Sequence, residues 1–153
     1  MSLRDVMKHS NVPAFQQIAR TVGLKTMQTY LNKFNYGNKK TGKVVDKFWL
    51  EGPLKISAIE QVKFLQILFS NNSPISASIQ KQLKNIMFLE NKNGWKLYGK
   101  TGWPSKIGWF VGLIEKNDQQ YFFALNMDLE KFENLSLRQE IADEIFTLII
   151  ADY

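Results

Sequence analysis

The spacing of apolar residues changes twice along this sequence of 153 residues. Up to about residue 88 it follows the helical period: Phe15, Ile18 and Val22 recur at helical intervals between Pro13 and Gly23. From residue 95 to 128 the apolar residues alternate as they do in strands, and from residue 137 the helical period returns. Helices, then a run of closely connected strands, then a helix predict an α+β fold with an antiparallel sheet flanked by helices.

The individual elements follow from the same pattern. We predict helices at 13–22, 27–34, 57 to about 69, from about 75 to near 88, and from 137 onward, and strands at 95–101, 107–115 and 120–128. Ser57 with Glu60 and Ser136 with Gln139 have the spacing of helix-capping boxes. The last helix is expected to bury one apolar face, which consists of Leu137, Ile141, Ile145, Leu148 and Ile149.

No internal repeat or linker divides the sequence, so we predict a single partial domain over residues 1–153. Its helical part covers about 1–93, and the sheet with the closing helix covers about 94–153. Three strands and one closing helix leave a small sheet with an open edge, so the fold is expected to be incomplete in this chain. Residues 36–53 mix glycine, proline and asparagine, which predicts a long loop of the kind that is often functional.

Charge and composition exclude several classes of function. The net charge of +6 comes from scattered lysines without a nucleic-acid-binding motif, so we expect a charged surface and no nucleic-acid partner. The chain has one histidine, His9, and no cysteine, so no metal site is expected. No apolar run approaches the roughly 20 residues of a membrane span, and the first residues do not resemble a signal peptide.

Three short motifs occur in the order Ser10-Asn11-Val12, Tyr36-Gly37-Asn38 and Lys100-Thr101-Gly102. Each alone has an ordinary explanation, since serine often caps a helix and Lys-Thr-Gly is also a common strand end. The surrounding segments add to them: VPAFQQIAR at 12–20, KFWLEGPLKIS at 47–57, GWFVG at 108–112 and YFFALNM at 121–127. Together these residues resemble the class D β-lactamases (oxacillinases), a branch of the penicillin-recognising serine enzymes, over essentially the whole chain.

The resemblance implies hydrolysis of the β-lactam amide by acyl transfer to a serine. By that resemblance Ser10 relays the proton that the ring nitrogen needs, and Lys100 supplies positive potential beside it. The backbone N–H of Trp103 would provide half of the oxyanion hole.

The remaining site residues also come from the resemblance. Thr101, Gly102 and Arg138 would bind the carboxylate of penicillins and cephalosporins, for which a guanidinium fork is well suited. An apolar pocket that holds a carboxylated lysine in this family would include Val12, Trp49 and Leu50. The motif Tyr36, Gly37 and Asn38 is assigned a structural role in the loop.

One motif of the family, Ser-x-x-Lys, is not found at its expected place in this sequence. The motif, which holds the nucleophile and the lysine that becomes carboxylated, belongs well upstream of Ser10 in that family. The one literal match here, Ser78 to Lys81, follows the long loop, so we interpret it as a chance match. We therefore expect this chain alone to be inactive, without the carbamate that the family forms from CO2. The family's helix that carries Ser-x-x-Lys also covers apolar surface, and we expect a homodimer or strand exchange to bury that surface in its absence.

Two other functions remain open: the β-lactam sensor domain of a membrane receptor, and a catalytically dead interaction protein. An upstream transmembrane region would indicate the sensor, and a cleavable signal peptide would indicate a periplasmic or secreted β-lactamase. Two origins of the chain are also open: Met1 is a start inside a longer gene, or the chain is a natural truncated product.

Overall fold

The computed structural model describes residues 2–92, 94–104 and 106–150. The elements are α1 Leu3–Lys8, α2 Val12–Val22, α3 Leu24–Lys33, α4 Ala58–Leu68, α5 Ala77–Met87, β1 Phe88–Lys92, β2 Trp95–Gly102, β3 Ile107–Lys116, β4 Gln119–Asp128, the 3-10 helix η1 Phe132–Asn134, and α6 Leu137–Ile150. The predicted α+β class is confirmed.

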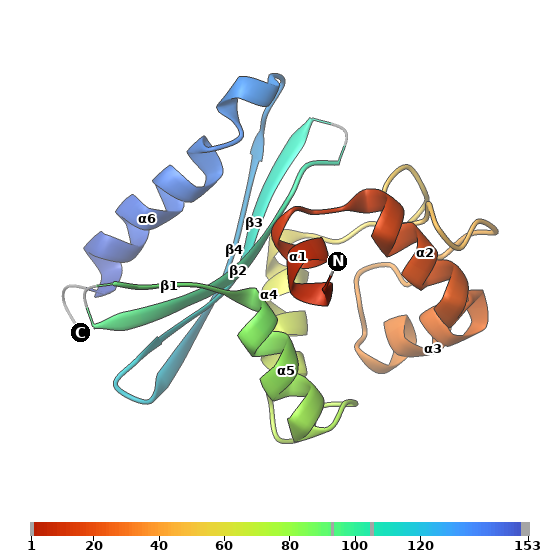
Figure 1. Ribbon diagram of the computed structural model, residues 1–153, viewed down its shortest axis with the longest axis horizontal. Helices are drawn as coiled ribbons and strands as arrows, with labels where there is room; N and C mark the ends of the chain where they lie inside the picture. Colours follow the sequence, from red (N-terminus) through yellow and green to blue (C-terminus); the bar gives the residue numbers. More distant parts are fainter. Residues whose placement is uncertain (1, 93, 105, 151–153) are drawn as a thin grey trace.

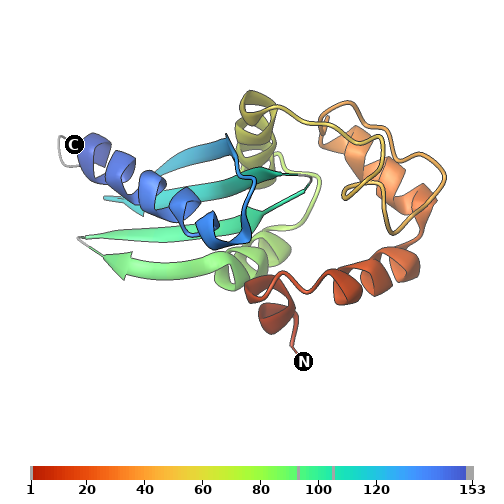
Figure 2. The same cartoon turned by 90° about the horizontal axis from the view of Figure 1, so that it is seen from above.

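The sheet has four strands in the order β1-β2-β3-β4, and each strand pairs antiparallel with the next. Helix α6 covers one face of the sheet, while α4 and α5 pack against the other (Figure 1). Helices α2 and α3, together with the long loop, lie further out beyond α4 and α5 (Figure 2). The sheet is therefore the middle of three layers, between α6 and the pair α4 and α5, and α2, α3 and the long loop lie outside these layers (Figure 2).

Strand β1 was not predicted. The chain passes directly from Met87, the last residue of α5, into a strand that begins at Phe88. The sequence predicts the end of the helix correctly but assigns Phe88 and Leu89 no further structure. Pairing with β2 gives this short segment its structure, which apolar spacing over so few residues does not indicate. The sheet therefore begins inside the segment that we assigned to the helical part.

Local sequence signals explain most other boundaries. Ser57 and Glu60 form the predicted capping box of α4, and Gly23 ends α2 with φ 81°. Asn117 and Asp118 both have positive φ between β3 and β4, as a tight two-residue hairpin turn requires. Residues 35–57 contain only turns and irregular backbone, as predicted for the long loop.

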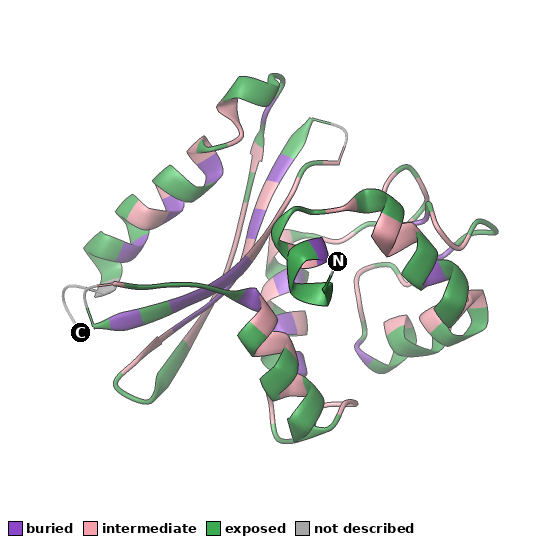
Figure 3. Cartoon of the chain, viewed as in Figure 1, coloured by how far each residue is buried: buried purple, intermediate pink, exposed green. Residues whose placement is uncertain are grey.

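The core lies on both faces of β3 because successive side chains of a strand alternate between the two faces. Phe110 and Ile114 pack with Phe146 of α6, whereas Leu113 packs with Met87 on the opposite face. The buried residues accordingly follow the middle of the sheet and the inward faces of the helices (Figure 3). Phe110 is 1% exposed and lies at the centre of the α6 side.

The predicted buried face of α6 is partly wrong. The residues that pack inward are Arg138, Ala142 and Phe146, which recur at i, i+4 and i+8. Ile145, Leu148 and Ile149 are exposed, and Leu148 is 74% exposed. The leucines and isoleucines form one stripe that is rotated around the helix from the face that meets the sheet, so apolar spacing alone does not identify that face.

Apolar side chains are also exposed on α2, where Val12, Ile18 and Val22 share one face of the helix with the buried Ala19.

None of the helices in the described ranges combines the length and the apolarity that crossing a membrane requires.

Candidate active site

The end of β2 places Lys100, Thr101 and Gly102 beside β3. Their partners across the ladder are Val111, Phe110 and Trp109, in that order. The strand pairing fixes the position of the Lys-Thr-Gly backbone, so its side chains and carbonyl groups project from a rigid element.

Ser10 lies at the junction between α1 and α2. Its φ is 48°, in the left-handed region that residues other than glycine adopt uncommonly. Asn11 is the N-cap of α2: its side chain accepts a hydrogen bond from the N–H of Ala14 at 3.0 Å, and its own N–H donates to the carbonyl of Val6 at 3.0 Å. These contacts hold the exposed Ser10 between two helix ends.

Lys100 and Ser10 are brought together across 90 positions of sequence. The Nζ of Lys100 donates a hydrogen bond to Ser10 Oγ and a second one to the carbonyl oxygen of Thr101, at 2.5 Å. Burial and then the positive charge of Arg138 lower the pKa of Lys100 to about 8. A fraction of this amine is therefore neutral at physiological pH.

Arg138 extends from the first turn of α6 to the end of β2. Its Nε donates to the carbonyl of Leu135 at 2.7 Å, and its Nη1 donates to the carbonyl of Gly102 at 2.6 Å. The residue is only 7% exposed, and burial lowers the pKa of its guanidinium. These two hydrogen bonds fix the guanidinium beside the Lys-Thr-Gly motif.

The positive charges of Lys100 and Arg138 lack a carboxylate partner within the described part of the chain. The ion pairs found there join other groups: Arg20–Asp46, Lys84–Glu115, Lys92–Asp143, Lys106–Glu130 and Lys131–Glu133. Burying a cation without a partner costs free energy, and two adjacent cations also repel one another. Such an arrangement favours binding of an anion from solution.

Trp103 follows the motif directly. Its indole Nε1 donates to the carbonyl of Leu129 at 3.0 Å, and its ring lies 6.0 Å from that of Phe132. This contact holds the segment after β2 against the segment after β4. The predicted role of the Trp103 backbone N–H remains a prediction.

The motif Tyr36, Gly37 and Asn38 makes the contacts that a loop-shaping role requires. The ring of Tyr36 packs edge-on against Phe64 at 4.7 Å. A Cβ on Gly37, which has φ 47°, would lie 2.1 Å from the carbonyl oxygen of Lys55. Asn38 joins the two ends of the loop, because its N–H donates to Lys55 O at 2.9 Å and its Nδ2 donates to Pro53 O at 2.8 Å.

The three residues predicted to line an apolar pocket are not fully buried. Val12 is 38% exposed, Trp49 and Leu50 are half-buried, and the Trp49 ring packs edge-on against Phe48 at 4.9 Å. Their role in a carbamate pocket stays a prediction.

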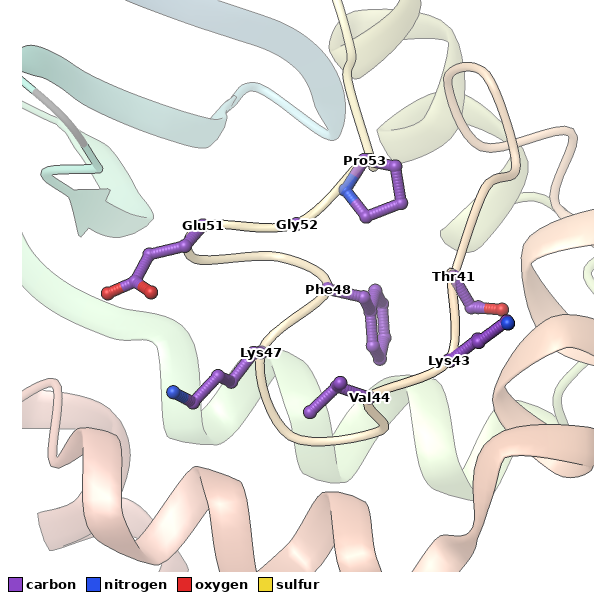
Figure 4. A pocket seen from close by; sticks show the side chains of 8 residues that line it. All are labelled: Thr41, Lys43, Val44, Lys47, Phe48, Glu51, Gly52 and Pro53. Carbon is purple, nitrogen blue, oxygen red and sulfur yellow. The ribbon is translucent and has the colours of Figure 1, made fainter.

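A separate hollow of about 210 Å³ lies inside the long loop (Figure 4). Its lining consists of Thr41, Lys43, Val44, Lys47, Phe48, Glu51, Gly52 and Pro53. It includes none of Ser10, Lys100 and Arg138, so it is distinct from the cationic cluster, by which we mean Lys100 and Arg138.

Ser78, the serine of the literal Ser-x-x-Lys match, is exposed in the first turn of α5. Its Oγ accepts a hydrogen bond from Gln82 Nε2 at 3.4 Å, within the same helix. The base next to a nucleophilic serine should contact its hydroxyl, but among the described residues Ser78 Oγ is hydrogen-bonded to Gln82 and not to Lys81. This supports our interpretation of Ser78 to Lys81 as a chance match.

Three residues that support the site were missed from the sequence. Leu129 and Leu135 act through backbone carbonyl groups, which leave no signal in side-chain patterns. Gly108 is buried where a Cβ would lie 2.8 Å from Arg138 Cδ, so it makes room for the guanidinium arm. A glycine inside a predicted strand was the available signal for such a close approach.

Comparison with known proteins agrees with the resemblance seen in the sequence motifs. Residues 1–147 match the family model of the penicillin binding protein transpeptidase domain. The chain is 43% identical over 152 residues to β-lactamase OXA-5 of Pseudomonas aeruginosa, a match that covers 95% of this chain and 57% of that protein. It is 40% identical over 148 residues to β-lactamase OXA-48 of Klebsiella pneumoniae, covering 94% and 56%.

Solved structures agree with the sequence matches. FUS-1 (OXA-85), a class D β-lactamase from Fusobacterium nucleatum subsp. polymorphum, superposes with a TM-score of 0.92 at 49% identity, covering 97% of this chain and 63% of that one. The class D β-lactamase YbXI from Nostoc gives a TM-score of 0.89 at 35% identity, covering 94% and 63%. The chain thus spans a little over half the length of its curated relatives. It belongs to the penicillin binding protein transpeptidase domain family, in which the relatives it resembles are class D β-lactamases.

Proposed function

We propose that this chain supplies the carboxylate-binding and proton-transfer residues of a class D serine β-lactamase. The observation that supports the proposal most strongly is the pair of cations, Lys100 and Arg138, without a carboxylate partner in the described residues. Penicillins and cephalosporins carry a carboxylate next to the β-lactam ring, which matches this charge. The names of the relatives point to the same class of substrate.

In the proposed reaction, Arg138 and the Thr101 hydroxyl bind the substrate carboxylate, and Gly102 positions the guanidinium through its carbonyl. The hydroxyl of Ser10 passes a proton to the ring nitrogen as the amide bond breaks, and the Lys100 ammonium replaces that proton. The Trp103 N–H would stabilise the oxyanion.

The nucleophile and the carboxylated lysine of the family have no counterpart that we can assign among these residues. Val12, Trp49 and Leu50 would line the apolar pocket for the carbamate, which would serve as the general base. We propose that the polypeptide of 153 residues does not turn over β-lactams by itself, and that the full-length protein acts in the periplasm or outside the cell. A homodimer would cover part of the exposed apolar surface.

The test is a calorimetric titration of the chain with benzylpenicillin and with its uncharged methyl ester. The acid should bind and the ester should not. Arg138→Ala should weaken binding of the acid roughly 10- to 150-fold, because a hydrogen bond to a charged group contributes about 1.5–3 kcal/mol. Arg20→Ala is the matched control, since Arg20 is exposed and pairs with Asp46.

Equal affinity for acid and ester, or equal losses in the two arginine variants, would contradict the proposal. In parallel, hydrolysis of a chromogenic cephalosporin should stay at the rate without protein. Sustained turnover would show that these 153 residues contain a complete catalytic set.

A further inference from the structure

We propose that Ser10 and Lys100 form a nucleophile–base pair in this polypeptide, so that Ser10 Oγ accepts an acyl group from an activated ester. This role differs from the proton relay proposed above, since here Ser10 itself forms the covalent bond. It does not depend on carboxylate recognition, so it applies to uncharged donors as well.

The contact between the two side chains is the first support. Lys100 Nζ donates to Ser10 Oγ. A neutral amine carries a lone pair that accepts a hydrogen bond, so the same contact allows the hydroxyl to donate to Nζ once Lys100 has lost its proton. A nucleophilic serine needs a base in hydrogen-bond contact with its hydroxyl, and lysine fulfils that role in Ser–Lys hydrolases.

The position of Ser10 is the second support. The residue is exposed, so an electrophile reaches Oγ from solvent. Its backbone has φ 48° and is held from both sides, because the N–H of Ser10 donates to Met7 O at 3.2 Å and Asn11 caps α2. An exposed side chain on a constrained backbone is a common arrangement for reactive residues.

The surroundings of Lys100 favour its neutral form. Its partner across the ladder is the apolar Val111, its side chain is half-buried, and the charged group that acts on it is the guanidinium of Arg138 on α6. Desolvation and a neighbouring cation both destabilise an ammonium, which is how lysines become general bases. A pKa of about 8 leaves roughly a tenth of the amine neutral at pH 7.

The proposed step is balanced without an additional reactant. Neutral Nζ takes the hydroxyl proton while Ser10 Oγ forms a bond to the ester carbonyl carbon. The bond from that carbon to the aryl oxygen then breaks, and the aryloxide leaves with the electron pair. The products are an acyl-serine, a Lys100 ammonium and a phenolate.

The experiment incubates the chain with p-nitrophenyl acetate, an uncharged donor, and follows p-nitrophenolate release and the intact mass. One acetyl group should attach, and peptide mapping should place it on Ser10. After the rate of Ser10→Ala is subtracted, the rate should rise about 90-fold from pH 6 to pH 9, following the neutral fraction of a group with a pKa of about 8.

Three variants make the result decisive. Ser10→Ala should remove the adduct, and Lys100→Arg, which keeps the positive charge but cannot act as a base at these pH values, should slow labelling at least tenfold. Ser78→Ala is the matched control and should label at the rate of the unchanged chain. Labelling on Ser78 or on lysines, or a rate at Ser10 that is unaffected by Lys100→Arg, would overturn the proposal.

The outcome is separable from the carboxylate proposal. Labelling at Ser10 without penicillin binding would support the nucleophile–base pair and contradict the β-lactam site. Penicillin binding without labelling would do the reverse.

Discussion

Replacing Gly108 with alanine is expected to destabilise the fold and to disturb the cationic cluster at the same time. A Cβ at this position would lie 2.3 Å from Leu129 Cδ1 and 2.8 Å from Arg138 Cδ, whereas carbon atoms in contact ordinarily lie about 3.5–4.0 Å apart. Both neighbours are buried, so neither side chain moves away freely. Inserting a methyl group into such a packed region costs typically about 1–3 kcal/mol of the free energy of unfolding.

The matched control is Gly102→Ala on the neighbouring strand. A Cβ there would meet Trp109 Cβ at 3.6 Å, an ordinary contact, so its unfolding free energy should change by less than about 1 kcal/mol. Urea unfolding followed by circular dichroism gives both values, with the slope of free energy against urea unchanged. If Gly108→Ala proves as stable as Gly102→Ala, the packing around Arg138 is looser than the structure indicates.

The remaining predictions concern the cationic cluster, the core and a helix cap. Because the pKa of Lys100 is lowered to about 8, the unfolded chain binds a proton between pH 8 and about 10.5 that the folded chain does not. Stability should therefore rise with pH from about 8 to 9.5 relative to Lys100→Met in urea unfolding, and parallel curves would contradict this. Phe110→Ala should cost about 3–5 kcal/mol in the same assay, whereas Phe132→Ala, at a side chain that is 76% exposed, should cost less than about 1 kcal/mol. Asn11→Ala should cost about 1 kcal/mol through the lost cap of α2, and no change would mean that water replaces the cap.

The fold was predictable from the sequence wherever one periodic signal dominates. The alternation in 107–115 and 120–128 predicted strands β3 and β4 to within one residue at every end. The short strand β1 was missed because its structure depends on pairing with β2, a tertiary effect. The buried face of α6 was partly wrong because Ile145, Leu148 and Ile149 continue the apolar pattern away from the sheet.

The sequence named candidate residues for the site but gave no information on how they are arranged. Ser10, Lys100 and Arg138 came from a resemblance between motifs, and no pattern in the sequence states that Lys100 Nζ contacts Ser10 Oγ. That contact depends on how α1 and α2 meet the end of β2. The two hydrogen bonds of Arg138 to backbone carbonyls were likewise invisible before the fold was known.

The most direct test of the anion site is nuclear magnetic resonance of the arginine side chains. The sequence has three arginines, Arg4, Arg20 and Arg138, so the Nε–Hε signals are few and each is assigned by substitution. During titration with benzylpenicillin, the signal of Arg138 should shift and saturate, while those of Arg4 and Arg20 stay in place. If the Arg138 signal does not move at penicillin concentrations that saturate binding, the carboxylate is bound elsewhere and the account of this site is wrong.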